Sequence, residues 1–329
     1  MLAVITGATG LVGANLAEAL LQSGHRVRAT RRATSRLDHV EDLDVDWVEA
    51  DLHDAEALTR AFDGADAVFH CAAAVTVRDV PPPWVITTNV EGTGNVLRAV
   101  RDAGAGRLLY CSSTVTIGIS EDGEPCDEST TWNLREHGLD DGYATTKYQA
   151  ELLVRGMAAE GMDVVTVNPG FMFGPRDVRP SSGELIVNVV RGTVPGHTPG
   201  LNCFVDVRDV CRGMIAAWER GRAGERYILG HRNMSYRAIF ETIAEVAGVK
   251  PPGFAVPEWA SVIAGWGGDA FQRVTDRDAP VNSATIRWAY CKGFKFSSDK
   301  ARAELGYAPG PIEPAIEDAV AWFKARGML

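Results

Sequence analysis

LAVITGATGLVGANL, residues 2–16, is the stretch that decides the fold. Its apolar start is typical of a buried strand, its three glycines of a tight turn, and its end of a helix. Gly7 permits the turn, Gly10 leaves the backbone open to a pyrophosphate, and Gly13 lets the helix pack close to the sheet. The free N–H groups and positive dipole end of a helix over Val12–Ser23 would face that pyrophosphate. The stretch therefore predicts a dinucleotide site, with a purely structural turn as the alternative.

Strands and helices alternate through the first half of the chain. The expected strands are His25–Thr30, Trp47–Glu49, Ala67–Cys71, Arg107–Cys111 and Asp163–Val167, the last ended by Asn168-Pro169-Gly170. The expected helices between them are Ala55–Phe62, Trp84–Ala103 and Tyr143–Glu160. Continuous apolar strands separated by helices are typical of a parallel sheet covered on both faces. We therefore expect an α/β protein with a Rossmann-type, doubly wound parallel sheet.

The pattern changes after Gly170. Prolines and glycines break the next forty or so residues into loops and short elements; the prolines are Pro175, Pro180, Pro195 and Pro199. One further strand, Tyr227–Leu229, is expected to return to the sheet, and the expected helices are Tyr236–Ala247, Val256–Gly265 and Pro314–Arg326. We therefore divide the chain into a dinucleotide-binding domain, residues 1–170, and a smaller, mostly helical substrate-binding lobe, residues 171–329. The lobe should lie over the carboxyl edge of the sheet, where doubly wound folds bind their ligands.

Composition excludes several classes of protein. The chain has 329 residues and a formal net charge of -10, which leaves no basic surface for nucleic acid. It has no run of eighteen apolar residues, so we expect no membrane insertion, and because Met1 leads straight into a strand we expect a cytoplasmic protein. Its six cysteines lack CxxC spacing and its seven histidines lack paired spacing, so we expect no metal site and no disulfide framework.

Tyr143-Ala144-Thr145-Thr146-Lys147 places a phenol and an ammonium group one helical turn apart. A lysine cation a few ångströms away favours a phenolate and would lower the pKa of Tyr143 from its ordinary value near 10. The pair then becomes usable for proton transfer. Ser113, at the carboxyl end of an expected strand, could hydrogen-bond the same substrate oxygen. The alternative, a helix-surface pair and a serine turn, is disfavoured by the dinucleotide motif upstream.

In these motifs the chain resembles the extended short-chain dehydrogenases/reductases, the NAD-dependent epimerase/dehydratase group. The matching segments are TGATGLVG (6–13), Asp51-Leu52 with Asp54, HCAA (70–73), NVEGT (89–93), YCSST (110–114), YATTK (143–147), NPGFMFGP (168–175) and FVDVRDV (204–210). The likeness is strongest to dihydroflavonol-reductase-like and hopanoid-associated sugar-epimerase-like bacterial proteins, in NPGFMFGPRDVRPSSG, GERYILG and KFSSDKARAELGY.

The resemblance implies a role for each matching residue. Tyr143 would be the catalytic acid/base, Lys147 its activator and a ribose ligand, and Ser113 the residue that binds the substrate oxygen. Implied contacts to the cofactor come from Thr6, Gly7, Thr9, Gly10, Leu11, Val12, Asp51, Leu52, Ala72, Ala73, Asn89, Ser112, Tyr143, Lys147, Pro169 and Gly170. Implied contacts to the substrate come from Thr114, Asn168, Phe171 and Met172. It further implies a homodimer that pairs the helices Trp84–Ala103 and Tyr143–Glu160.

The end of the second strand bears on the choice of cofactor. An acidic residue there would bind the ribose 2′-hydroxyl and repel a 2′-phosphate, but the sequence reads Thr30-Arg31-Arg32. Two guanidinium groups can hold a phosphate. The sequence therefore favours NADP(H), with Arg31 and Arg32 as its ligands, and leaves NAD(H) as the alternative.

The family holds two reaction classes, and the sequence contains signals for both. Asn168 lies where nucleotide-sugar epimerases and dehydratases contact a diphosphate. Those enzymes also carry an arginine before the position of Phe204, where this chain has Leu201-Asn202-Cys203. The missing charge favours a net reductase or dehydrogenase.

Apolar residues of the second half bear on the substrate. They are Phe171, Met172, Phe173, Trp259, Trp266, Phe271 and Trp288, and they are expected either in the core or around a bulky hydrophobic substrate. A protein that binds the cofactor without turnover is a third alternative. The retained Ser113, Tyr143 and Lys147 argue against it.

Overall fold

A computed structural model describes residues 1–178 and 181–329, so that Pro180, one of the expected loop prolines, lies outside the described residues. A parallel sheet of seven strands forms the centre, in the order β3-β2-β1-β4-β5-β6-β9. Its strands are β1 (Leu2–Thr6), β2 (Arg26–Arg31), β3 (Asp46–Glu49), β4 (Ala67–His70), β5 (Arg107–Cys111), β6 (Val164–Pro169) and β9 (Arg226–Leu229). The doubly wound parallel sheet and the returning strand predicted from the sequence are confirmed.

The order of the strands reverses between β1 and β4. From β1 the chain builds outward to β2 and β3, and then it returns to add β4, β5 and β6 on the other side. The carboxyl ends of β1 and β4 meet in register at Thr6 and His70. Ligands of doubly wound sheets bind in the crevice at such a switch point, and the glycine turn follows β1 there.

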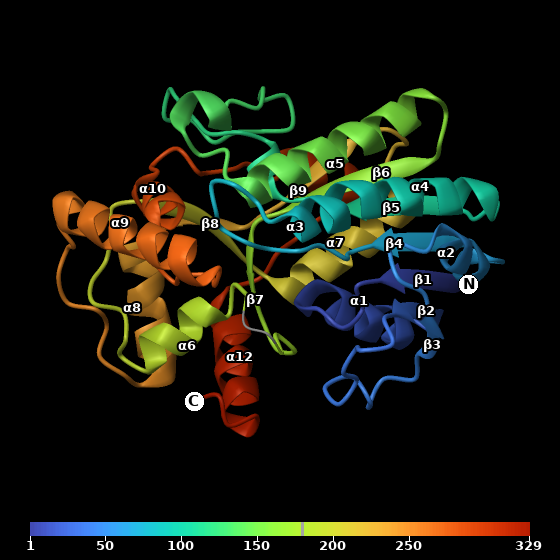
Figure 1. Cartoon of the computed structure of the whole chain (residues 1–329). Helices are drawn as coiled ribbons and strands as arrows, with labels where there is room; N and C mark the ends of the chain where they lie inside the picture. The colour runs from blue at the N-terminus through green and yellow to red at the C-terminus, as the bar shows by residue number, and fades with distance from the viewer. Residues whose placement is uncertain (179–180) are drawn as a thin grey trace.

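Helices cover both faces of the large sheet (Figure 1). The helices are α1 (Leu11–Gln22), α2 (Ala55–Phe62), α3 (Pro83–Ile86), α4 (Gly92–Asp102), α5 (Gly142–Ala159), α6 (Glu184–Val190), α7 (Val207–Arg220), α8 (Tyr236–Ala247), α9 (Glu258–Thr275), α10 (Ser283–Tyr290), α11 (Asp299–Leu305) and α12 (Glu313–Ala325). Leu16 of α1 and Met214 of α7 share one core cluster with Phe69 of the sheet. Leu58 of α2, Val96 of α4 and Ala150 of α5 share another, with different strand residues.

A second, smaller sheet lies in the other half of the molecule. It has the order β10-β8-β7 and is made of β7 (Phe171–Phe173), β8 (Leu201–Asp206) and β10 (Arg232–Ser235), which the sequence did not predict. Phe173 and Phe204 stack within the core that it forms with α6, α8 and α12. Figure 1 places α6, α8 and α12 away from the N-terminus, beyond the end of the large sheet.

Two predicted elements have boundaries that are wrong by more than one residue. The strand expected to end at Val167 continues through Asn168 and Pro169, which pair with Ile228 and Leu229 of β9. Pro169 is the last residue of the strand, and the next backbone N–H, that of Gly170, donates to the Leu229 oxygen at 3.1 Å.

The helix predicted over Val256–Gly265 begins at Glu258 and continues to Thr275. Its glycines do not end it, because Gly265 and Gly268 lie against the backbone of residues 281–283, where a Cβ would leave too little room. The helix expected over Trp84–Ala103 has nearly the expected bounds but differs inside. It is a continuous helical segment from Pro83 to Asp102, interrupted by a wider π-helical turn at Thr87–Glu91 that contains Asn89.

Candidate active site

The turn after β1 has the geometry of a phosphate cradle. Gly7 has a φ of 78°, and a Cβ there would lie 2.6 Å from the Ala72 nitrogen. A Cβ on Gly13 would overlap the Gly7 carbonyl oxygen, whereas a Cβ on Gly10 would meet only that oxygen, at 3.5 Å. Gly7 and Gly13 are therefore required by the protein itself. Gly10 has room within the protein, so its lack of a side chain fits a ligand.

The N-terminus of α1 is open to an anion. Gly10 is the residue that precedes the helix; no side chain caps the helix there, and its first turn contains no acidic residue. An uncapped helix end presents free N–H groups and the positive end of the helix dipole. The residues present thus fit the diphosphate of a dinucleotide, which would lie over Gly10, Leu11 and Val12.

Asn89 and His70 support the wall beside this turn. The Asn89 Oδ1 accepts a hydrogen bond from the Ala74 nitrogen at 2.7 Å, and its Nδ2 donates to the Ala74 oxygen at 2.9 Å. These bonds fix the end of the segment that contains Ala72 and Ala73. His70 bridges Thr6 Oγ1 at 2.7 Å and Thr93 Oγ1 at 3.0 Å. Asn89 and Thr6 therefore use their side chains inside the protein and would shape the site rather than contact the ligand with them.

The buried imidazole of His70 should make the protein less stable in acid. Burial and the nearby Lys147 charge lower the pKa of His70 to about 3. This pKa is below the value of about 6.5 expected for histidine in the unfolded chain. The contribution of the neutral His70 side chain to the free energy of unfolding is therefore complete above about pH 6.5 and is lost as the pH falls toward 3. We expect His70→Gln to remove up to about 1.4 kcal/mol per pH unit from the slope of the unfolding free energy near pH 5, measured by urea unfolding. Equal slopes in the two proteins would contradict this assignment.

Tyr143, Lys147 and Ser113 come together where β5 ends. Tyr143 and Lys147 lie on α5, and Ser113 follows β5 directly and begins a short 3₁₀ turn. The Lys147 Nζ donates to the Tyr110 hydroxyl at 3.0 Å and to the Cys111 oxygen at 2.9 Å. An ammonium group has three N–H donors, so one remains for a ligand.

The expected lowering of the pKa of Tyr143 is wrong for the protein without ligands. Burial raises the pKa of Tyr143, and this effect outweighs the Lys147 charge and the Ser113 hydrogen bond, which both lower it. The sequence reveals the cation one turn away but not the loss of solvent around the phenol. Tyr143 is therefore a neutral phenol at neutral pH, which is the form that can donate a proton.

The helix that carries Tyr143 is anchored from the other half of the chain. Asp141 caps α5 by accepting from the Ala144 nitrogen at 2.9 Å, and its other oxygen accepts from Trp288 Nε1 at 2.6 Å. Trp288 lies on α10. Trp288 was one of the apolar residues considered for a substrate pocket, and its indole N–H instead anchors α5. Phe173, another residue of that group, is fully buried in the core.

The other apolar residues considered for a substrate pocket are more exposed to solvent. Trp259, Trp266 and Phe271 are exposed on α9, and Phe171 and Met172 are half-buried on β7.

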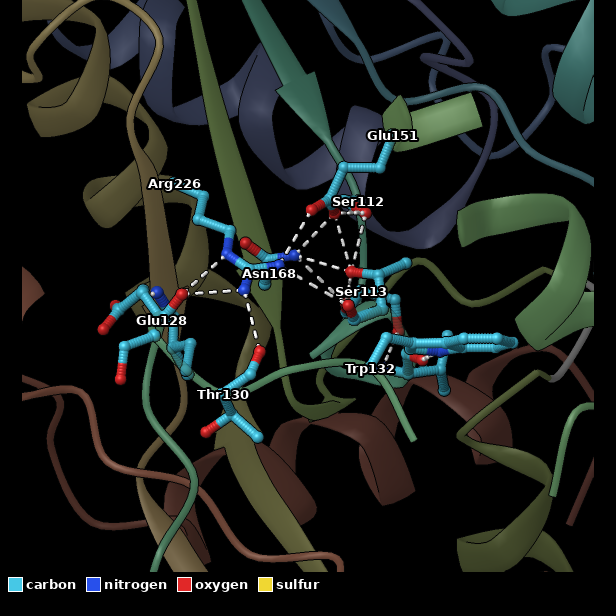
Figure 2. A network of polar contacts seen from close by, with 12 residues as sticks. Ser112, Ser113, Glu128, Thr130, Trp132, Glu151, Asn168 and Arg226 are labelled. Carbon is cyan, nitrogen blue, oxygen red and sulfur yellow. Dashed lines mark hydrogen bonds and ion pairs between the residues drawn. The ribbon is translucent and has the colours of Figure 1, made fainter. Parts of the chain in front are cut away.

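A buried polar network lies beneath Ser113 (Figure 2). Asn168 is fully buried, and its Nδ2 donates to Glu151 Oε2 at 2.9 Å. Ser112 donates its hydroxyl to the same oxygen at 2.6 Å. Thr114 is buried as well. The side chains of Ser112 and Asn168 are thus bonded to another residue of the protein, and their expected contacts to cofactor and substrate stay predictions.

Glu151 and Arg226 are residues that the sequence analysis missed. The Arg226 Nη1 lies 3.2 Å from Glu151 Oε1, and the Glu151 side chain is only 2% exposed. Glu151 follows Lys147 by four residues on α5, so the spacing that identified Tyr143 and Lys147 would also have identified it. No signal in the sequence pairs it with Arg226, which lies 75 residues away.

Arg31 and Arg32 differ in the structure. Arg31 ends β2, and its Nη2 lies 3.8 Å from Glu49 Oε2. Arg32 is exposed, and its guanidinium has no ion pair with any residue the structure describes. Asp51 accepts from the His53 nitrogen at 2.9 Å, and Leu52 contacts Gly92. Among the described residues, Arg31 thus has an acidic neighbour and Arg32 has none.

The described residues contain no helix that is both long and apolar enough to cross a membrane. Within residues 1–178 and 181–329, no cluster of three His, Cys, Asp or Glu side chains is arranged to hold a metal ion.

Comparison with known proteins gives consistent results. The model described as "NAD dependent epimerase/dehydratase family" matches residues 3–230. A "Putative dihydroflavonol 4-reductase" of Synechocystis sp. is 36% identical over 331 residues, which cover 99% of this chain and 95% of the relative. "Sterol demethylase protein B" of Methylococcus capsulatus is 35% identical over 332 residues, which cover 100% of both chains. The solved structure of gox2253 has a TM-score of 0.86 and 35% identity and covers 100% of this chain and 99% of that one.

Proposed function

The chain belongs to the NAD dependent epimerase/dehydratase family, and from this premise we propose that it is an NADP(H)-dependent oxidoreductase that interconverts a ketone and a secondary alcohol. The observation that carries this proposal is that Ser113 and the Lys147 charge both act on the Tyr143 phenol at the carboxyl end of β5, where Lys147 donates to the Cys111 oxygen. A dinucleotide would lie on Gly10, Leu11 and Val12, along Ala72 and Ala73, and against Pro169 and Gly170. When bound, it would supply or accept the hydride.

The residues of the chain would manage the substrate oxygen and its proton. In the direction of reduction, Tyr143 donates its phenolic proton to the carbonyl oxygen as the carbonyl carbon receives the hydride, and Ser113 donates a hydrogen bond to that oxygen. The phenolate left behind is stabilised by the Lys147 charge and takes its proton back from solvent. Burial raises the pKa of Tyr143, so the phenol carries the proton that this step requires.

A bulky hydrophobic molecule is the substrate class that we propose. The names of the two relatives, a dihydroflavonol reductase and a sterol demethylase protein, support polycyclic substrates. The apolar side chains of Phe171, Met172, Trp259 and Trp266 support the same class. Thr114 and Asn168 would position the segment after β5, residues 113–116, which would meet this substrate. The homodimer stays a prediction, which the exposed Leu152 and Leu153 on α5 support.

Arg32 provides the test of the cofactor. We expect Arg32→Ala to weaken NADPH binding about tenfold and to leave NADH binding unchanged, because only NADPH carries the 2′-phosphate. Arg31→Ala is the matched control, since Arg31 already faces Glu49, and it should have the smaller effect. Both affinities are measured by quenching of tryptophan fluorescence. Equal loss of NADPH and NADH affinity in Arg32→Ala would contradict the proposal.

A nucleotide-sugar epimerase or dehydratase with retained NAD⁺ is the second candidate. It is favoured by the position of Asn168 in the motif and by the name of the family. Against it, Leu201, Asn202 and Cys203 carry no charge for a diphosphate. Tightly held NAD⁺ in the purified protein, which does not exchange with added NADPH, would favour this candidate over the reductase.

A further inference from the structure

Glu151 continues the face of α5 that carries the proposed chemistry. Tyr143, Lys147 and Glu151 follow one another at four-residue spacing, so the proton donor, the cation and this carboxylate lie one above another on the helix. Glu151 points into the protein, where a charge is costly unless other groups compensate it. Its partners show what it holds.

Each oxygen of the Glu151 carboxylate has its own partners. Oε2 accepts from the Ser112 hydroxyl at 2.6 Å and from Asn168 Nδ2 at 2.9 Å, and it lies 2.6 Å from Thr116 Oγ1. Oε1 faces the Arg226 guanidinium at 3.2 Å. Oε2 thus accepts hydrogen bonds from residues that follow β5 and from Asn168 of β6. Oε1 forms an ion pair with Arg226, the first residue of β9.

The network reaches Ser113 through its carbonyl group. Thr116 Oγ1 lies 2.7 Å from the Ser113 oxygen, and Asn168 Nδ2 lies 3.2 Å from it. Thr116 has a single hydroxyl proton, and Asn168 Nδ2 lies 2.8 Å from Thr116 Oγ1. Thr116 is the donor in both of its short contacts, to Glu151 Oε2 at 2.6 Å and to the Ser113 oxygen at 2.7 Å, so its one proton is shared between the carboxylate and the Ser113 carbonyl group. Glu151 therefore holds Thr116 and Asn168, the two side chains that contact the Ser113 carbonyl oxygen.

Arg226 is fixed from its other side. Its Nη2 donates to the carbonyl oxygens of Glu128 at 2.7 Å and Thr130 at 3.2 Å, and its Nε donates to the Glu128 oxygen at 3.0 Å. Figure 2 shows the guanidinium held between these carbonyl groups and Glu151. A rigidly bound cation can hold the carboxylate in one position, and losing either partner would leave a poorly compensated charge.

We propose that Glu151, held by Arg226, is a positioning residue that sets the main chain of Ser113 and thereby directs the Ser113 hydroxyl at Tyr143. The proposal rests on the role proposed above for Tyr143 and extends it. Glu151 does not itself meet the substrate. It acts through Ser112, Thr116 and Asn168 on the residue that does.

Glu151→Gln is the sharpest variant because it keeps the shape and removes the charge. A glutamine must place its NH₂ group either toward Asn168 Nδ2, which is a donor, or toward the Arg226 guanidinium, which is also a donor. In either orientation the NH₂ group of the glutamine, a donor, faces another donor. We therefore expect the hydrogen bonds that lead to Ser113 to be disturbed. Arg226→Lys keeps a cation, although it cannot reproduce the planar contacts, and it should show a smaller effect.

The titration of Tyr143 reports on the position of Ser113 without any substrate. The protein is labelled with difluorotyrosine, whose phenol ionises nearer to neutral pH, and the Tyr143 signal among the seven tyrosines is assigned by Tyr143→Phe and followed by ¹⁹F NMR. Ser113→Ala should raise the pKa of the residue at 143, because its hydrogen bond lowers it. We expect Glu151→Gln to raise it too, with about a tenfold change in the ionisation constant, and to add little in the double variant with Ser113→Ala.

The sign of the shift separates this proposal from a simpler effect. Removing a negative charge should by itself favour the phenolate and lower the pKa of Tyr143, whereas displacing Ser113 should raise it. Asp209→Asn, which removes the buried carboxylate that pairs with Arg212 on α7, is the matched control and should lower stability without moving the Tyr143 titration.

An unshifted or lowered Tyr143 titration in folded Glu151→Gln would overturn the proposal and leave the proposed reaction untouched. If Glu151→Gln does not fold, Thr116→Val tests the same link to Ser113 without removing a charge. An upward shift is expected there, and its absence would overturn the proposal equally.

Discussion

Replacing Tyr143 with phenylalanine is expected to lower NADPH-dependent turnover about 10³-fold and to leave NADPH affinity within about twofold. The variant keeps the ring and removes the group that would donate the proton to the substrate oxygen. Without that donor, the oxygen would gain negative charge beside Ser113 alone. Turnover is measured with 3-oxo steroids and dihydroflavonols as probes, by loss of NADPH absorbance, and affinity is measured by tryptophan fluorescence.

Tyr148→Phe is the matched control for this variant. Tyr148 lies on the same helix and stacks on Trp132 with ring centroids 4.2 Å apart, a contact that phenylalanine can keep. It should retain turnover. If Tyr143→Phe and Tyr148→Phe were equally active, Tyr143 would not be the acid, and a protein that binds the cofactor without turnover would become the better description.

Local spacing revealed much of this protein because its central motifs are local. The glycine turn and the Tyr143–Lys147 pair each lie within one turn or one helix, so their geometry follows from the backbone. The alternation of apolar strands and helices predicted the parallel sheet for the same reason. These predictions required no knowledge of what packs against each element.

The parts that the sequence did not reveal depend on distant contacts. Tyr143 is half-buried by residues that the fold brings together, and this loss of solvent reversed the expected direction of its pKa shift. The pairing of Glu151 with Arg226 joins α5 to β9, and the helix through Gly265 and Gly268 depends on the backbone that faces them. A one-dimensional pattern contains the residues of such contacts but not their partners.

Replacing Gly10 with valine should abolish tight dinucleotide binding without unfolding the protein. A Cβ on Gly10 would meet only the Gly7 oxygen, at 3.5 Å, and Gly10 is exposed, so we expect the fold to accept valine there, with its methyl groups in the space over the open end of α1. We expect at least about a 100-fold loss of NADPH affinity, about 3 kcal/mol, with a melting temperature within a few degrees of the wild type.

Two further glycine variants make this result specific to a ligand. Gly13→Val should lose both stability and binding, because its Cβ would overlap the Gly7 carbonyl oxygen. Gly253→Val, at a loop position with no heavy atom within 4 Å of an added Cβ, should lose neither. Gly10 alone should then separate binding from folding, which a purely structural turn would not do. Wild-type NADPH affinity in Gly10→Val would instead show that the cofactor does not bind over this turn, and the proposed oxidoreductase would lose its cofactor site.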